Sequence, residues 1–166
     1  MYNYPYSCHP MSPTPPYWNQ PFYPTEAYPM MQQMPSYDKG NSPNVVDIQQ
    51  LTKHNHYFRT VIWTGKHLQV TLMCIGVGDD IGLEIHPHTD QFLRIEDGEG
   101  LVQIGEHKDQ LTFQQYVCPG SAIMIPAGVW HNLINVGNRP LKLYSIYAPP
   151  EHPFGTIHAT KAQAPV

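Results

Sequence analysis

The chain has 166 residues, which is enough for one domain, and its formal net charge is -4 at neutral pH. Its three cysteines, Cys8, Cys74 and Cys118, are odd in number and lack C-x-x-C spacing, which argues against a disulfide framework or a thiolate zinc site and favours a reducing compartment. The chain shows neither a basic leader with an apolar segment nor eighteen consecutive apolar residues, so we expect a cytoplasmic protein without secretory signal or membrane span.

Acidic side chains dominate the stretch from residue 79 to residue 109, where only Arg94 and Lys108 oppose them. The acidic members are Asp79, Asp80, Glu84, Asp90, Glu96, Asp97, Glu99, Glu106 and Asp109. A face with this charge repels phosphate backbones and anionic headgroups. We therefore expect neither a nucleic-acid partner nor binding to an anionic membrane.

The first 43 residues differ in composition from the rest of the chain. They hold most of the tyrosines and more than half of the prolines, but no Leu, Ile or Val. Because such a segment cannot form a packed interior, residues 1–43 are predicted to be a disordered, polyproline-like tail. Two interpretations stay open, an extension without a role and an adhesive tail that makes multivalent contacts through its Tyr, Met, Trp18 and Phe22 side chains. The composition resembles that of bacterial spore-coat tails, which implies a spore-coat location and coat or assembly proteins as partners.

The segment after the tail leads into the predicted folded domain. Asn44 is expected to cap a short helical turn over Val45 to Leu51. His54 and His56 form a His-x-His pair, but they lie in a polar stretch before any clear strand. We interpret them as exposed and without a ligand.

Short β-type runs separated by turns make up the remainder of the domain. They cover Tyr57 to Thr64, His67 to Ile75, Leu83 to His86, Gln91 to Glu96, Gly100 to Gly105, Gln110 to Val117, Ala122 to Ile125, Trp130 to Val136 and Leu141 to Tyr147. No long helical period competes with them. Many short, evenly spaced strands predict an all-β sandwich or barrel.

The stretch from Gly82 to Gly100 contains the candidate chemistry. His86 and His88 are separated by one residue, a spacing that turns both imidazoles to one face of an extended strand. Glu84 shares that face. The stretch favours a metal site over the alternative of two buried, hydrogen-bonded histidines.

A second stretch, from Gly120 to Asn135, supports the first. Its turn at Pro126-Ala127-Gly128 reverses or bends the chain and could direct His131 towards the histidine pair. Three imidazoles from distant parts of the chain would then converge.

These two stretches resemble the two motifs of the cupin superfamily. Gly120, Pro126, Gly128, His131 and Asn135 match the second motif. The first motif is matched by His86, His88 and Gly98, with Gln91 in place of the usual glutamate. The resemblance covers roughly residues 55–155 and implies a double-stranded β-helix, a jelly-roll barrel with a metal in its mouth. The barrel domain is expected to span residues 44–157.

The resemblance also implies a set of ligands. His86, His88, Gln91 and His131 are the expected metal ligands, with Glu84 as an additional ligand or outer neighbour. The metal would be a divalent ion, and zinc, manganese, iron and nickel are not distinguished. Candidate pocket residues are Arg94, Asn135, Lys142 and Tyr144. The alternatives are that Arg94 and Lys142 face solvent and that the Asn135 amide bridges strands. Tyr144, Tyr147, Trp130 and Phe92 are interpreted as ordinary packing.

The end of the chain is expected to leave the barrel. The run Ala148 to Pro153 contains three prolines that cannot donate to a strand ladder, so it should wrap the outside. Residues 158–166 are predicted to be a frayed tail.

Two hypotheses of different class follow. In the first, the chain resembles the short cupins described as similar to mannose-6-phosphate isomerase, and is a metal-dependent isomerase or dioxygenase acting on a sugar-like or carboxylate small molecule. In the second, it is a non-catalytic structural or ligand-binding barrel that residues 1–43 carry into a spore-coat-like assembly. Exposed edge strands in a small barrel also favour a homodimer.

Overall fold

The structure is a computed structural model that describes residues 37–164. They belong to one compact unit, Ser36–Val166. Residues 1–36 of the predicted tail lie outside the described residues. Residues 37–43, which were also predicted to belong to the tail, form part of the compact unit, because Asp38 is buried and accepts hydrogen bonds from the backbone N–H of Gly155 and the hydroxyl of Thr64.

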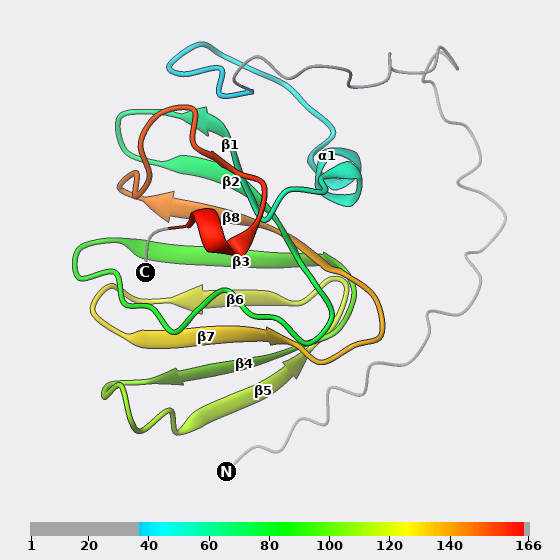
Figure 1. Cartoon of the computed structure of the whole chain (residues 1–166). Coiled ribbons are helices and arrows are strands. Elements are labelled where there is room, and N and C mark those ends of the chain that lie inside the picture. Colours follow the sequence, from blue (N-terminus) through cyan, green and yellow to red (C-terminus); the bar gives the residue numbers. More distant parts are fainter. Residues whose placement is uncertain (1–36, 165–166) are drawn as a thin grey trace, which may run out of the picture. The chain divides into compact units, whose positions relative to one another are not determined.

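Within the described residues, nine strands form two antiparallel sheets. Figure 1 shows how the labelled strands are arranged. The strands are β1 Arg59–Thr64, β2 Gln69–Ile75, β3 Asp90–Asp97, β4 Gly100–Gly105, β5 Phe113–Val117, β6 Ala122–Ile125, β7 Trp130–Asn135, β8 Leu141–Ala148 and β9 Ile157–His158. The larger sheet has the order β6-β3-β8-β2-β1-β9, and the smaller one has the order β5-β4-β7. The prediction of an all-β fold is confirmed.

One end of the interior between the sheets is apolar. Leu93 and Ile95 of β3 and Leu143 of β8 are fully buried, as is Leu133 of β7 in the smaller sheet. Alternate residues of a strand point to the same face, so these positions continue along each strand at intervals of two. Burial of this aliphatic cluster drives the two sheets together.

The same inward rows become polar towards the other end. Gln91 continues the row of β3, Ser145 and Tyr147 continue that of β8, and Gln69 and Thr71 continue that of β2. All five side chains are buried. Because buried polar groups need partners, this end of the barrel is where a polar site is expected.

The only α-helix of the described residues is α1, Ile48–His54, and it begins three residues later than predicted. Its N-cap is Asp47, whose carboxylate accepts from the backbone N–H of Gln50 at 3.0 Å. At its C-terminus, the Lys142 ammonium donates to the carbonyls of Lys53 at 2.6 Å and Asn55 at 2.9 Å. No helix among residues 37–164 is both long and apolar enough to span a membrane.

We call residues 149–164 the C-terminal segment, which is red in Figure 1. Its last part was predicted to be frayed, but the structure places it on the barrel. His158 of β9 pairs with Arg59 of β1, and a 3-10 helix, η1, follows at Lys161–Gln163. The Lys161 ammonium forms ion pairs with Asp79 and Asp80. These long-range contacts hold the segment against the barrel.

Candidate metal centre

A short backbone pairing between the loop before β3 and strand β7 positions the first two site residues. The N–H of Glu84 donates to the carbonyl of His131 and the N–H of His131 donates to the carbonyl of Glu84, both at 3.0 Å. Residues directly opposite each other in an antiparallel pair project their side chains to the same side. The Glu84 carboxylate therefore lies beside the His131 imidazole.

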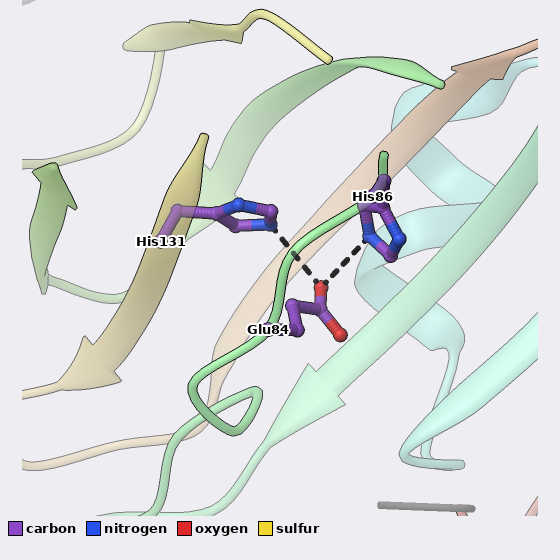
Figure 2. A group of neighbouring side chains, drawn as sticks. All are labelled: Glu84, His86 and His131. Carbon is purple, nitrogen blue, oxygen red and sulfur yellow. Dashed lines mark ion pairs between the residues drawn. The ribbon is translucent and has the colours of Figure 1, made fainter. Parts of the chain in front are cut away.

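His86 completes the group from two residues further along the loop. Its backbone carbonyl accepts from the N–H of Gly128 at 2.8 Å, which fixes the loop against the turn before β7. Its Nε2 atom lies 3.3 Å from Oε1 of Glu84, and Nε2 of His131 lies 3.4 Å from the same oxygen. Figure 2 shows the three side chains directed towards one another.

The far nitrogen of each imidazole has a partner outside this group. Nδ1 of His131 lies 3.0 Å from the carbonyl of Val129, and Nδ1 of His86 lies 3.2 Å from Oε1 of Glu151. A carbonyl only accepts, so Nδ1 of His131 carries a hydrogen and the neutral ring presents a lone pair at Nε2. Metal-binding histidines are typically held by such an outer acceptor.

The inward atoms fit a metal ion. Nε2 of His86, Nε2 of His131 and Oε1 of Glu84 are buried and have no hydrogen-bond partner. Two imidazole lone pairs facing one carboxylate oxygen repel it unless a cation lies among them. Donors bound at about 2.0–2.1 Å to one tetrahedral ion lie about 3.4 Å apart. The observed separations of 3.3 and 3.4 Å match this value.

Electrostatics at the group also favour a cation. Burial by itself raises the pKa of the Glu84 carboxyl, but the imidazoles of His131 and His86 outweigh that effect and lower the pKa to about 2. Burial lowers the pKa of His86, but Glu84 and Glu151 outweigh it, so that the pKa is raised. The ionised Glu84 thus attracts either a proton onto an imidazole or a metal ion bound by all three residues.

Comparison with known proteins identifies the family. The cupin domain family matches residues 71–147. Uncharacterized protein YrkC of Bacillus subtilis is 65% identical over 127 residues, which are 76% of this chain and 68% of the relative. A crystal structure of a Bacillus halodurans protein is 66% identical with a TM-score of 0.75, over 75% of this chain and 95% of that one. The chain belongs to the cupin superfamily.

Two more distant relatives of this cupin extend the comparison. An uncharacterized protein of Acanthamoeba polyphaga mimivirus is 42% identical over 125 residues, covering 75% of this chain and 76% of the relative. A crystal structure from Thermus thermophilus is 21% identical with a TM-score of 0.53, over 63% of this chain and 96% of that one, and it shows the fold alone. The predicted cupin fold is confirmed, whereas similarity to mannose-6-phosphate isomerase stays a prediction.

Gln91 is placed by the cupin fold in the buried polar row of β3. Its Nε2 donates to the Ser145 hydroxyl at 3.2 Å, while its Oε1 is buried without a partner. Its neighbour across the sheet is Tyr147, whose ring lies edge-on to the His86 ring with 5.5 Å between centroids. A free carboxamide oxygen at this position is a suitable fourth donor, and its role as a ligand stays a prediction.

His88 is not brought to the group. Residues 87 and 88 form a turn, and the His88 side chain is exposed. The expected sharing of a face by His86 and His88 required an extended strand, but the loop before β3 is extended only around Glu84 and bends at Pro87. Glu84, which the sequence suggested as an additional ligand, faces both imidazoles instead.

The four predicted pocket residues of this cupin have other contacts. Arg94 and Tyr144 are cross-strand neighbours on the face of the sheet opposite to Gln91. Nε of Arg94 lies 3.2 Å from Oε1 of Glu96, and the Tyr144 ring packs on Phe92. The Asn135 amide donates to the carbonyls of Ile75, Gly76 and Arg139. Lys142 caps helix α1, as described above. Strand alternation and the local partners of each side chain account for these positions.

Sequence patterns did not indicate four residues that surround the group. Arg59 is buried on β1, with Nη2 3.9 Å from Oε2 of Glu84. Glu151 and His152 follow the prolines after β8, a run predicted to wrap the outside. Tyr147 was interpreted as packing. No motif or spacing marks Arg59, Glu151 and His152, because their positions depend on the return of the C-terminal segment to β1. Tyr147 is placed by the pairing of β8 with β3.

Proposed function

We propose that this cupin binds a divalent metal ion through Glu84, His86 and His131, with the carboxamide oxygen of Gln91 as a fourth ligand. The observation that carries the proposal is the convergence of three buried donor atoms without other partners. In this scheme the metal is presented to a sugar-like or carboxylate small molecule. An isomerase-type or oxygen-dependent reaction is consistent with such a centre.

The donor set narrows the choice of metal. Two imidazoles and one carboxylate are the ligands of many catalytic zinc sites and of non-heme iron oxygenases. The absence of thiolate and thioether ligands from the proposed set disfavours copper(I). A bound ion would supply Lewis acidity, and zinc or iron would fit better than magnesium, which prefers oxygen ligands.

The remaining residues would prepare the centre for its ligand. Glu151 and the Val129 carbonyl hold the two imidazoles with their Nε2 atoms inward. The side chains of Glu84 and Glu151 are 23% and 29% exposed, so solvent reaches the centre from their side. Burial lowers the pKa of His152, and Arg59 adds to the effect, so its pKa is about 3 and its ring is neutral at physiological pH.

Metal analysis of histidine variants tests the proposal. The wild-type protein should contain one metal ion per chain by mass spectrometry, and His131→Ala should lose it, because one of three buried donors is removed. His88→Ala is the matched control, since this exposed side chain does not face the other donors. Equal metal loss in both variants would show that the motif-based ligand set is correct and the proposed set is wrong.

A further inference from the structure

A buried guanidinium lies next to the proposed centre without a full set of partners. The Arg59 side chain is 4% exposed, and its Nε atom has no hydrogen-bond partner. Its nearest carboxylate atom is Oε2 of Glu84, at 3.9 Å, which is beyond hydrogen-bonding distance. Buried charges in proteins are usually paired and hydrogen-bonded, so Arg59 retains capacity to bind an anion.

Two polar groups close to His86 also lack partners, and the Tyr147 ring lies edge-on to the His86 ring with 5.5 Å between centroids. The Tyr147 hydroxyl and Nε2 of His152 are buried and make no hydrogen bond. The two rings pack edge-on with 4.9 Å between centroids. Gln69 holds the His152 backbone, because its Oε1 accepts from the His152 N–H at 2.9 Å. Unsatisfied buried polar atoms are few in native proteins, and several of them in one place indicate a ligand site.

The formal charges around the proposed centre indicate the charge of the ligand. Glu84 and Glu151 supply two negative charges and Arg59 supplies one positive charge, so a divalent metal ion leaves the centre with a net charge of plus one. This balance suits a monoanion. A phosphate dianion would need further cations, but Lys142 and Lys161 are bound elsewhere in the fold.

We propose that Arg59, together with Tyr147 and His152, binds the carboxylate group of a small monocarboxylate beside the metal. The inference rests on the proposed metal centre, and it selects the carboxylate over the neutral sugar-like ligand. A planar guanidinium fits a carboxylate through two parallel hydrogen bonds. Arg59 is close enough to the centre for this role, because it approaches one oxygen of Glu84 while the imidazoles face the other.

Acetate and acetamide form a matched pair of probes, because they have the same shape and differ in charge. We would load the full-length protein with Co²⁺ and titrate each probe, following the visible spectrum and the heat of binding. Acetate should bind at least tenfold more tightly than acetamide. In Arg59→Gln, acetate affinity should fall at least tenfold while Co²⁺ affinity stays within threefold of wild type.

The control variant is Arg94→Gln, which removes a half-exposed guanidinium from the opposite face of the sheet. Its acetate affinity should stay within twofold of wild type. Tyr147→Phe, which removes only the buried hydroxyl, should weaken acetate severalfold without changing Co²⁺ affinity. This variant decides the question if Arg59→Gln does not fold.

The outcomes separate the two proposals. If Co²⁺ does not bind to the wild-type protein, the proposed metal centre is wrong. If Co²⁺ binds but acetate and acetamide are equivalent, the carboxylate site is wrong and the metal centre stands. If Arg59→Gln weakens Co²⁺ and acetate by the same factor, Arg59 only positions Glu84, which also overturns the inference.

Discussion

The two carboxylate oxygens of Glu84 face different groups. Oε1 faces the Nε2 atoms of both histidines, and Oε2 faces Arg59. The backbone pairing with His131 sets the direction of the Glu84 side chain. The two imidazoles lower the pKa of the Glu84 carboxyl, so it is ionised despite its burial. A single residue thus links the proposed metal centre to the proposed carboxylate site.

Glu151 is expected to control metal affinity without binding the metal. It faces Nδ1 of His86 at 3.2 Å and so holds Nε2 towards the centre. Loss of such an outer partner typically weakens a metal site about 10- to 100-fold. Glu151→Ala should therefore raise the metal dissociation constant by roughly tenfold or more. Competition with a chromophoric chelator measures the constant.

The control for this variant is Glu106→Ala, which removes an exposed carboxylate from the turn after β4. Its metal affinity should equal that of wild type. Equal affinities in the Glu151 and Glu106 variants would mean that the Glu151 carboxylate does not orient His86.

The C-terminal segment is the element that closes the site region. It leaves β8, supplies Glu151 and His152, pairs with β1 through β9 and ends in η1. Near its end, the Lys161 ammonium binds Asp79 and Asp80. Anchoring of this segment at both ends keeps its acidic and imidazole side chains beside the barrel interior.

The ion pair between Asp80 and Lys161 should make stability depend on pH. Burial raises the pKa of Asp80, but Lys161, Asn132 and the Gly82 N–H outweigh it, so the pKa lies below its ordinary value of 3.8. A carboxyl with a depressed pKa stabilises the fold above its unfolded pKa, and this contribution is lost as pH falls through the folded pKa. The difference in unfolding free energy between wild type and Asp80→Asn should thus shrink below about pH 4.

Lys161 determines the pH above which the ion pair no longer contributes to stability. Burial lowers its pKa, but Asp79 and Asp80 outweigh it and raise the pKa above 10.5, so its contribution is complete below that pH and is lost only at higher pH. Urea denaturation of the wild type and Asp80→Asn between pH 3 and pH 8 measures the difference in their unfolding free energies. A difference that stays constant over this range would show that the ion pair does not anchor the segment.

At the scale of the whole molecule, the barrel interior is divided into an apolar end and a polar end. The apolar end contains the aliphatic cluster shared by both sheets, and the polar end contains the proposed centre. Burial of the aliphatic cluster at the apolar end stabilises the fold. The polar end can therefore contain a site with several unpartnered polar atoms.

Truncations should locate the boundary of the folded unit. Removal of residues 1–36 leaves Asp38 and its bonds to Gly155 and Thr64 in place, whereas removal of residues 1–43 deletes them. Loss of buried hydrogen-bond partners costs roughly 1–3 kcal/mol, so the longer truncation should melt several degrees lower. Differential scanning calorimetry compares the two. Equal melting temperatures would contradict a structural role for residues 37–43.

The shorter truncation also tests the second hypothesis from the sequence. If the N-terminal segment carries the barrel into a coat-like assembly, the protein without residues 1–36 should stay unassembled while His131→Ala assembles normally. Homodimer formation likewise stays a prediction, for which analytical ultracentrifugation is the measurement.

The sequence by itself predicted the all-β cupin barrel and named three of the proposed metal ligands, His86, Gln91 and His131, with Glu84 as an additional candidate. Both results depend on local signals, namely alternating side chains, turn residues and the spacing of the two motifs. Only the tertiary structure showed that Glu84, and not His88, faces the imidazoles of His86 and His131. It also showed that Arg59, Glu151 and His152 lie around the proposed centre. The physical reason is that a turn at Pro87 ends the alternation of the strand, and that contacts between β1 and a segment about a hundred residues later leave no periodic pattern in the sequence.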